Sequence, residues 1–322
     1  RAIAVPGTLA LPKRSPILAR PGHWCYQLPI DTTRRQAGNV LMSMASSNNQ
    51  DSATAAFRVW GCRGSVPISG PAFARHGGAT TCFCVEGPEG RIILDAGSGL
   101  AALGRSPDYV DRPTLLLLSH YHTDHVLGFP HFPPLFRPGW DLHVAGVPRA
   151  GRSPLEALVE VHHAPFFPVP LRDVMQATVH ERVHQLEGEG VFGGVRYAWT
   201  EVAHPGGASS FSFQHQGGRL VVASDVELEA LTDDRFASFV RGAAVLVIDA
   251  QFRDDEYPRF KGWGHSTAEQ AARFAAANGV GQLVLCHHDV ARTDDAIDQM
   301  VTSARAIMPN TVAAYEGLTI SL

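Results

Sequence analysis

The sequence has few of the features that mark membrane proteins, disulfide-stabilised proteins or nucleic-acid-binding proteins. No apolar run approaches the ~18 residues that a membrane-spanning helix needs, so no membrane partner is expected. The five cysteines are odd in number and form no CxxC pair, so a reduced, cytoplasmic setting fits best. Lys and Arg form no long run, and the formal net charge of −4 gives no general attraction for nucleic acid. These absences leave a globular protein of ordinary composition, 45% hydrophobic and 18% charged.

The first 54 residues differ in composition from the rest of the 322-residue chain. They mix prolines, arginines and polar residues without helical or strand periodicity, and an early apolar stretch is cut short by a Pro-Gly pair. The sequence starts with Arg1, and Met42 and Met44 are candidate start sites. We therefore expect residues 1–54 to be a tail or a non-native extension, and residues 55–322 to form one domain.

The most informative segment reads Ser-His-Tyr-His-Thr-Asp-His and directly follows four leucines at 115–118. A short aliphatic run that ends in polar residues is typical of a buried strand with functional groups at its C-terminal end. His120 and His122 lie two apart, so in an extended chain their rings point to the same side and can bind one ion. Asp124 and His125 follow the turn and can reach a second ion. Such ligands favour zinc, with manganese or iron as alternatives.

The second half of the chain repeats a pattern in which a predicted strand is followed by a ligand-type residue. The four pairs are 195–199 with His204, 219–222 with Asp225, 244–248 with Asp249, and 283–285 with His287. Each is a weak signal alone. We prefer His287 to His288 as a ligand because the strand end presents it first. A Gln-Gly-Gly sequence at 216–218 predicts a hairpin, and residues 227–240 predict an amphipathic helix.

The pattern His-x-His-x-Asp-His at 120–125 resembles the signature of the metallo-β-lactamase superfamily. The resemblance implies an α+β fold, a four-layer αββα sandwich with a metal site at the strand ends. Asp95, which follows a predicted strand and precedes two glycines, resembles the first motif of that superfamily. There the carboxylate braces the ligand loop rather than binding metal. A plain helix N-cap is the alternative role for Asp95, and both roles can hold.

The order of motifs in that superfamily implies two divalent ions, most simply zinc, with manganese or iron as alternatives. One ion is expected on His120, His122 and His204, the other on Asp124, His125 and His287, with Asp225 as the bridge between them. Two such ions, roughly 3.5–4 Å apart, can share a hydroxide and lower the pKa of its parent water toward ~7. Asp124 is counted among the catalytic residues as well as among the ligands.

The sequence Gly-His-Ser-Thr-Ala-Glu-Gln-Ala-Ala at 264–272 resembles the ribonuclease Z-like and phosphodiesterase-like branch of the superfamily. In that branch the residue matching His265 faces the phosphate and donates a proton or a hydrogen bond, which a departing alkoxide needs. Simple packing beside a helix N-terminus is the alternative. Ser266 and Glu269 predict a capping box for that helix, and Gly279 predicts its end. The resemblance covers residues 56–322.

Two proline and aromatic segments, 129–136 and 162–168, are expected to be loops over the pocket mouth. His131, His162 and His163 are not expected to be ligands, because none ends a predicted strand. Candidate substrate contacts are aromatic rings that can stack on a flat group and arginines that can bind phosphate oxygens. They are Phe132, Phe167, Trp263, Arg63 and Arg75. Simple loop packing for the aromatics and a surface salt bridge for the arginines are the alternatives.

These residues favour a metal-dependent hydrolase of phosphodiesters that uses a metal-bridging hydroxide. Small or cyclic nucleotide-type substrates are favoured over a nucleic acid polymer, because the net charge is negative and no long basic arm is present. Hydrolysis of thioesters, lactones or synthetic phosphotriesters at the same site is the alternative. A non-catalytic metal-binding accessory protein is a third interpretation. The resemblance also implies a homodimer, since related proteins are often dimers.

Overall fold

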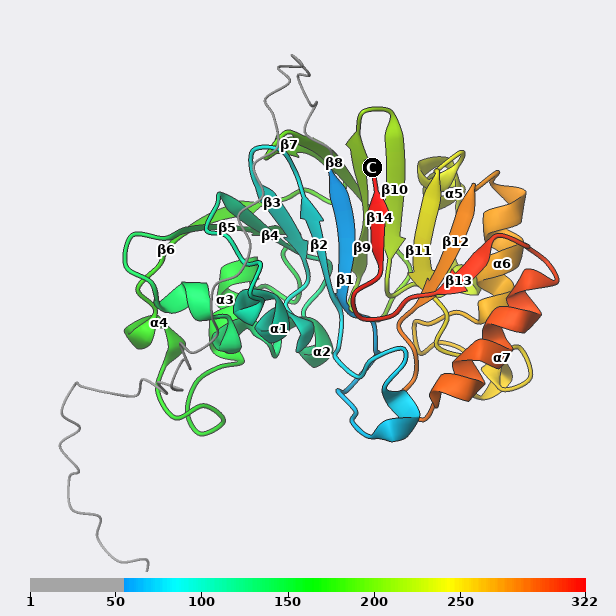
Figure 1. Ribbon diagram of the computed structural model, residues 1–322, viewed down its shortest axis with the longest axis horizontal. Coiled ribbons are helices and arrows are strands. Elements are labelled where there is room, and N and C mark those ends of the chain that lie inside the picture. Colours follow the sequence, from blue (N-terminus) through cyan, green and yellow to red (C-terminus); the bar gives the residue numbers. More distant parts are fainter. Residues whose placement is uncertain (1–54) are drawn as a thin grey trace, which may run out of the picture. The chain divides into compact units, whose positions relative to one another are not determined.

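The computed structural model describes residues 55–322, and the predicted tail, 1–54, lies outside the described residues. The described residues form two mixed β-sheets of seven strands each (Figure 1). In spatial order the first sheet contains β14 (Thr319–Ser321), β1 (Ala56–Gly61), β2 (Cys82–Glu86), β3 (Arg91–Leu94), β4 (Thr114–Leu118), β5 (Asp141–Gly146) and β6 (Thr178–Val183). The second contains β13 (Thr311–Ala313), β12 (Gln282–Cys286), β11 (Val245–Asp249), β10 (Gly218–Ala223), β9 (Ala208–His215), β8 (Val195–Val202) and β7 (Gly188–Phe192).

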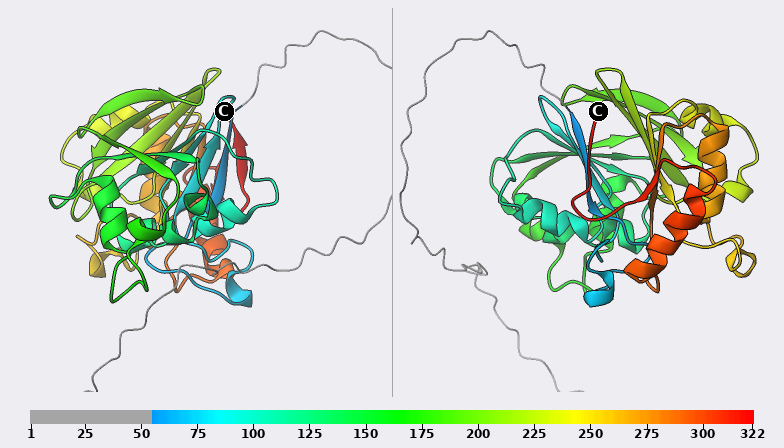
Figure 2. Two further views of the ribbon diagram at one scale, coloured as in Figure 1. Left: turned by 90° about the vertical axis from the view of Figure 1, so that its left-hand side faces the viewer. Right: turned by 45° about the vertical axis from the view of Figure 1, so that its right-hand side comes forward.

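Helices cover the outer faces of both sheets, which makes four layers (Figure 2). On the first sheet these are α1 (Gly99–Arg105), α2 (Thr123–Val126), α3 (Pro154–Glu160) and α4 (Leu171–Val174), and on the second α5 (Arg235–Val240), α6 (Ala268–Ala277) and α7 (Asp294–Arg305). Short 3₁₀ helices are η1 (Pro71–Phe73), η2 (Phe129–His131), η3 (Pro133–Phe136), η4 (Leu228–Ala230) and η5 (Tyr257–Arg259). The predicted αββα sandwich is confirmed. Within 55–322, no helix is long and apolar enough to cross a bilayer.

Strand β4 shows why the sequence folds in this way. Its four leucines are all buried. Leu115 and Leu117 pack into the core between the sheets, whereas Leu116 and Leu118 pack against the helices outside. A strand that is covered on both faces reads as a continuous apolar run rather than an alternating one.

Strand direction brings the predicted site residues to one end of the sandwich. Strands β3 and β4 are parallel, as are β10, β11 and β12. Strand β8 runs in the same direction as β10, because both pair antiparallel with β9. The carboxyl ends of these strands therefore lie together at the lower end of the sheets in Figure 1.

Two local predictions in the second half of the chain needed correction, and one was confirmed. The hairpin is present as β9 and β10, and Gln216 and Gly217 in its turn both have positive φ. The helix predicted over 227–240 is wrong, since this stretch contains only the short η4 and α5. The capping box of α6 uses Thr267 and Gln270 rather than the predicted pair, because the helix starts one residue later.

Candidate metal centre

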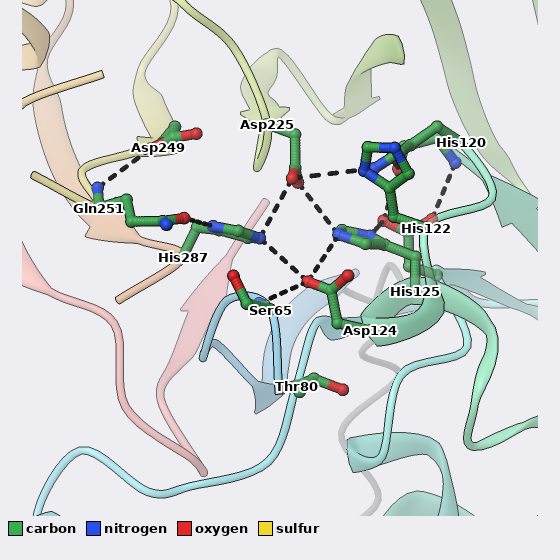
Figure 3. Close-up of polar contacts among 12 residues, drawn as sticks. Ser65, Thr80, His120, His122, Asp124, His125, Asp225, Asp249, Gln251 and His287 are labelled. Carbon is green, nitrogen blue, oxygen red and sulfur yellow. Dashed lines mark hydrogen bonds and ion pairs between the residues drawn. The ribbon is translucent and has the colours of Figure 1, made fainter. Parts of the chain in front are cut away.

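The seven predicted ligands lie together at the carboxyl ends of strands from both sheets. Figure 3 labels all of them except His204. Four of the seven follow β4, two in the loop and two in α2, and the remaining three follow β8, β10 and β12 of the second sheet. The set is His120, His122, Asp124 and His125 from the first sheet with His204, Asp225 and His287 from the second. The site therefore spans the two halves of the sandwich.

Within residues 55–322, five overlapping groups of donor atoms could hold an ion, and two of them match the groups that the sequence predicts. The donor atoms of His120, His122 and His204 lie within 4.8 Å of one another, as do those of Asp124, His125 and His287. The two nearest atoms of the first group are His204 Nε2 and His122 Nδ1, at 3.1 Å. In the second group, Asp124 Oδ2 lies 3.2 Å from His287 Nε2 and 3.3 Å from His125 Nε2.

Asp225 lies between the two groups. Its Oδ1 is 3.1 Å from His287 Nε2, 3.8 Å from His120 Nε2 and 4.0 Å from His204 Nε2. Its Oδ2 is 3.2 Å from His125 Nε2. The carboxylate thus faces ligands of both groups, which is the position that a bridging ligand requires.

Several of these atoms are buried without a hydrogen bond. They are His120 Nε2, His125 Nε2 and Asp225 Oδ2. Buried polar atoms are rarely left unsatisfied, so three such atoms that converge on one point indicate a missing partner. Imidazole nitrogens and carboxylate oxygens are the ligands that zinc, manganese and iron accept. The residues present therefore fit a divalent metal.

In three of the histidines the Nδ1 atom bonds to a partner outside the centre. His125 Nδ1 donates to Asp95 Oδ2, His204 Nδ1 to the Gly264 carbonyl and His287 Nδ1 to Gln251 Oε1, each at 2.8 Å. These bonds hold a proton on Nδ1, so Nε2 is the nitrogen that faces the centre.

Asp95 has the contacts of a bracing residue. It is fully buried, and its carboxylate also accepts from the backbone N–H and the hydroxyl of Ser119, both at 2.8 Å. The Ser119 hydroxyl in turn lies 3.0 Å from His120 Nδ1. The N-cap of α1 is Ser98 rather than Asp95. Asp95 therefore does not cap this helix.

The charges of the centre are coupled. Burial lowers the pKa values of His120, His122 and His204, which keeps their rings neutral. Burial acts in the same direction on His287, but the carboxylates of Asp225 and Asp124 outweigh it and raise its pKa to about 10. Because a ligand must lose its proton to bind metal, an ion that binds at His287 displaces a proton.

His265 lies beside the two ligand groups. Its Nδ1 donates to Asp249 Oδ2 at 2.7 Å, and its ring stacks on that of His287 with centroids 4.8 Å apart. Asp249 ends β11 and accepts from further backbone N–H groups, including that of Gln251 at 3.0 Å. The sequence placed Asp249 at a strand end but assigned it no role. Its position after a buried strand, like that of Asp225, is the signal that could have identified it.

Two further contacts of the centre were not predicted from the sequence. The Ser65 backbone N–H donates to Asp124 Oδ2 at 2.8 Å and orients that carboxylate. Gly64 lies against the His287 ring so closely that a Cβ on it would be 2.4 Å from the ring atoms. Both residues come from the turn after β1, far away in the sequence from the ligands they contact.

Some predicted substrate contacts are corrected by the structure. Arg63 is fully buried, and its guanidinium donates to the carbonyls of Gly77, Asp289 and Arg292, so it holds loops together. Phe132 is 1% exposed and packs in the outer core of the first sheet. Neither side chain is free to contact a substrate.

Arg75 and His288 also have partners away from the centre. Arg75 is exposed and pairs with Asp295 at 2.6 Å and Asp298 at 3.0 Å, the surface salt bridge that was the alternative. His288 Nε2 lies 3.4 Å from the Ala314 carbonyl, and burial lowers the pKa of His288 to about 3. His287 rather than His288 therefore faces the centre.

The remaining two aromatic candidates lie in loops. Phe167 packs edge-on against His162, with ring centroids 5.9 Å apart. Trp263 is 61% exposed, packs edge-on against Phe260 and comes two residues before His265. Their contact with a substrate stays a prediction.

Comparison with known proteins gives a family and relatives for this chain. Residues 90–288 match the family described as Beta-lactamase superfamily domain. Ribonuclease Z of Bradyrhizobium diazoefficiens is 33% identical over 278 residues, which cover 72% of this chain and 90% of that protein.

Solved structures show the same fold. The metallo-β-lactamase fold protein YhfI from Bacillus subtilis superposes with a TM-score of 0.65 at 19% identity, over 84% of this chain and all of that one. Zinc-bound PqqB from Methylobacterium extorquens gives 0.60 at 17% identity, over 83% of this chain and 100% of the other. The chain therefore belongs to the beta-lactamase superfamily, has ribonuclease Z homologues within it, and is a metal-dependent hydrolase.

Proposed function

We propose that the protein is a phosphodiesterase that uses two divalent ions, with small or cyclic nucleotide-type diesters as substrates. The observation that carries this proposal is the His265–Asp249 pair, 2.7 Å apart, beside the ligand groups. His265 also has donor atoms near those of His204 and Asp225 and near those of Asp249 and His287, but the seven predicted ligands do not include it. The ring is therefore available to move a proton rather than needed to bind metal.

The chemistry divides between the metal and the chain. Divalent ions on the seven ligands would supply Lewis acidity toward phosphate oxygens and a water nucleophile of lowered pKa. The Asp249 carboxylate can balance the charge of a His265 ring protonated on both nitrogens, so Nε2 can carry a proton to the leaving oxygen. An alkoxide needs that proton as it departs, whereas the thiolate released from a thioester is much less basic. The pair therefore favours a phosphodiester over a thioester.

The relatives support phosphodiester chemistry, because a ribonuclease cleaves the phosphodiester links of RNA. The formal net charge of −4 supports a small substrate, since a polymer of phosphates is bound mainly through Lys and Arg. Trp263, exposed two residues before His265, is the proposed contact for a flat group of that substrate.

A second candidate is cleavage of polymeric RNA. The observation in its favour is the 33% identity with a ribonuclease Z over most of both chains. It would use the same ligands and the same proton donor, so only the substrate separates the two candidates.

The test is turnover by the metal-loaded full chain of four substrates: bis(p-nitrophenyl) phosphate, a 2′,3′-cyclic nucleotide, a 3′-extended RNA and a thioester. We expect both small diesters to be cleaved. His265→Ala should lose about 10²- to 10⁴-fold on the cyclic nucleotide, and less on the nitrophenyl ester, whose leaving group needs little protonation. Trp263→Ala should raise KM for the cyclic nucleotide with little change in kcat.

The control is His163→Ala, which removes an exposed histidine outside the centre and should keep full activity. Metal content must be the same in all variants. Turnover of the thioester alone, or an unchanged rate for His265→Ala on the cyclic nucleotide, would show that the substrate class is wrong. Cleavage of the RNA but of neither small diester would select the second candidate.

A further inference from the structure

Glu227 is a buried carboxylate, 3% exposed, that lies just after β10 and faces the segment 257–264. Its Oε1 accepts from the Tyr257 hydroxyl and from the Gly262 N–H, both at 2.7 Å. Its Oε2 accepts from the Gly264 N–H at 2.9 Å. Every one of these donors is neutral and belongs to one segment. A buried charge is costly unless it is fully hydrogen-bonded, so these bonds tie the segment firmly to Glu227.

Gly264 connects Glu227 to a predicted metal ligand. Its N–H is held by Glu227, and its carbonyl accepts from His204 Nδ1 at 2.8 Å. Gly264 has a φ of +92°, and a Cβ on it would lie 2.4 Å from His204 Nδ1 and 2.2 Å from Pro205 Cδ. The peptide is thus fixed on one side by the carboxylate and packs on the other against the His204 ring.

Glu227 also reaches the turn that carries His204. Its backbone N–H donates to the Ala203 carbonyl at 2.9 Å. The residues that follow His204 in this turn include Gly206 and Gly207, both with a φ of +81°. Glycines leave a turn free to adopt other conformations, so the turn depends on contacts from outside to hold the ring in place.

We propose that Glu227 is a positioning residue for the metal centre: through Gly264 it sets the orientation and the tautomer of His204. The inference rests on the proposed function in taking His204 as a metal ligand. With the Nδ1 proton donated to Gly264, His204 Nε2 faces His122 Nδ1 at 3.1 Å and can bind metal. Without Glu227, the Gly264 peptide loses its anchor and the ring loses its fixed orientation.

The experiment is a competition titration of Zn²⁺ against a chromophoric chelator, with metal-free full chain and no substrate. Glu227→Gln keeps one acceptor oxygen but turns an amide N–H₂ toward the Gly264 N–H. We expect one of the two zinc equivalents to bind about 10- to 100-fold more weakly, as is usual when the partner of a ligand is lost, and the other to be unchanged. Glu227→Ala should weaken the same equivalent at least as much.

Two control variants complete the comparison with Glu227→Gln. Glu229→Gln removes a neighbouring carboxylate that is partly exposed and bonds to Lys261 and Gln270, and it should leave both zinc equivalents unchanged. Tyr257→Phe removes a donor to Glu227 but keeps the Gly264 bond, and should be close to wild type. Circular dichroism and thermal unfolding show whether each variant is folded.

His204→Ala separates this inference from the proposed function. If it binds both zinc equivalents like wild type, the ligand assignment itself fails. If it loses one equivalent while a folded Glu227→Gln binds both with wild-type affinity, the ligand assignment stands and the role of Glu227 is overturned.

Discussion

At the scale of single residues, burial decided which arginine is structural. Arg63 and Arg75 lie in neighbouring loops and carry the same charge. The Arg63 guanidinium is fully buried and donates to three backbone carbonyls from two distant segments. The Arg75 side chain is 56% exposed and pairs with carboxylates at the surface. If the side chain were removed, water could reach the partners of Arg75 but not the buried carbonyls that Arg63 binds.

We expect Arg63→Met to lower the free energy of unfolding by about 3–5 kcal/mol, because it leaves buried carbonyls without donors. Arg75→Met, the matched control, should cost no more than about 1 kcal/mol, as is usual for exposed ion pairs. Denaturant unfolding followed by circular dichroism measures both values. Equal costs for the two variants would contradict this assignment.

At the scale of elements, α6 begins one residue later than predicted, and this shift changes which side chains cap the helix. The Thr267 hydroxyl accepts from the Gln270 N–H at 3.0 Å, and Gln270 Oε1 accepts from the Thr267 N–H at 3.0 Å. Ser266, the predicted cap, instead donates its hydroxyl to the Val226 carbonyl. Ser266 therefore connects its own loop to the loop that contains Val226.

Thr267→Ala should destabilise the protein by about 1–2 kcal/mol, at the upper end for a cap because the hydroxyl also donates to Asp254. Glu269→Gln, which alters the residue that the sequence predicted to complete the box, should stay within about 0.5 kcal/mol of wild type. Urea unfolding of the two variants side by side provides the comparison. A larger loss of stability in Glu269→Gln than in Thr267→Ala would instead support the predicted capping box of Ser266 and Glu269.

The elements also show what the sequence could reveal. Ligands at strand ends were predictable because an apolar run, a turn and a polar residue are contiguous in the chain. The residues that orient those ligands were not predictable, since Gln251 and Glu227 act through loops whose paths depend on the whole fold. Phe132 was misassigned because proline-rich loops pack on the core as readily as they line a pocket.

At the scale of the whole molecule, the metal centre joins the two sheets. Four of the predicted ligands follow β4 of the first sheet, and three follow strands of the second. A metal that binds only the folded form stabilises it by an amount set by its concentration relative to Kd, about 2.7 kcal/mol at 100-fold excess.

Removal of metal by a chelator should therefore lower the Tm by roughly 5–10 °C for a domain of this size. Re-addition of Zn²⁺ should restore it. In Asp225→Asn, which weakens the ligand shared by both groups, the shift between the chelated and zinc-loaded forms should shrink. Differential scanning calorimetry with metal analysis of the same samples measures this. A Tm that does not respond to chelation in a protein that carries metal would contradict the coupling.

Gly64 offers no reactive atom, yet the ring of His287 occupies the space where any other side chain would begin. The smallest change, to alanine, would place a methyl group 2.4 Å from two atoms of that ring, so the ring or the turn has to move. A screen for loss of function would therefore report Gly64 as strongly as it reports a ligand. Sensitivity to mutation at this centre measures the volume that the ligands need as well as the chemistry that they perform.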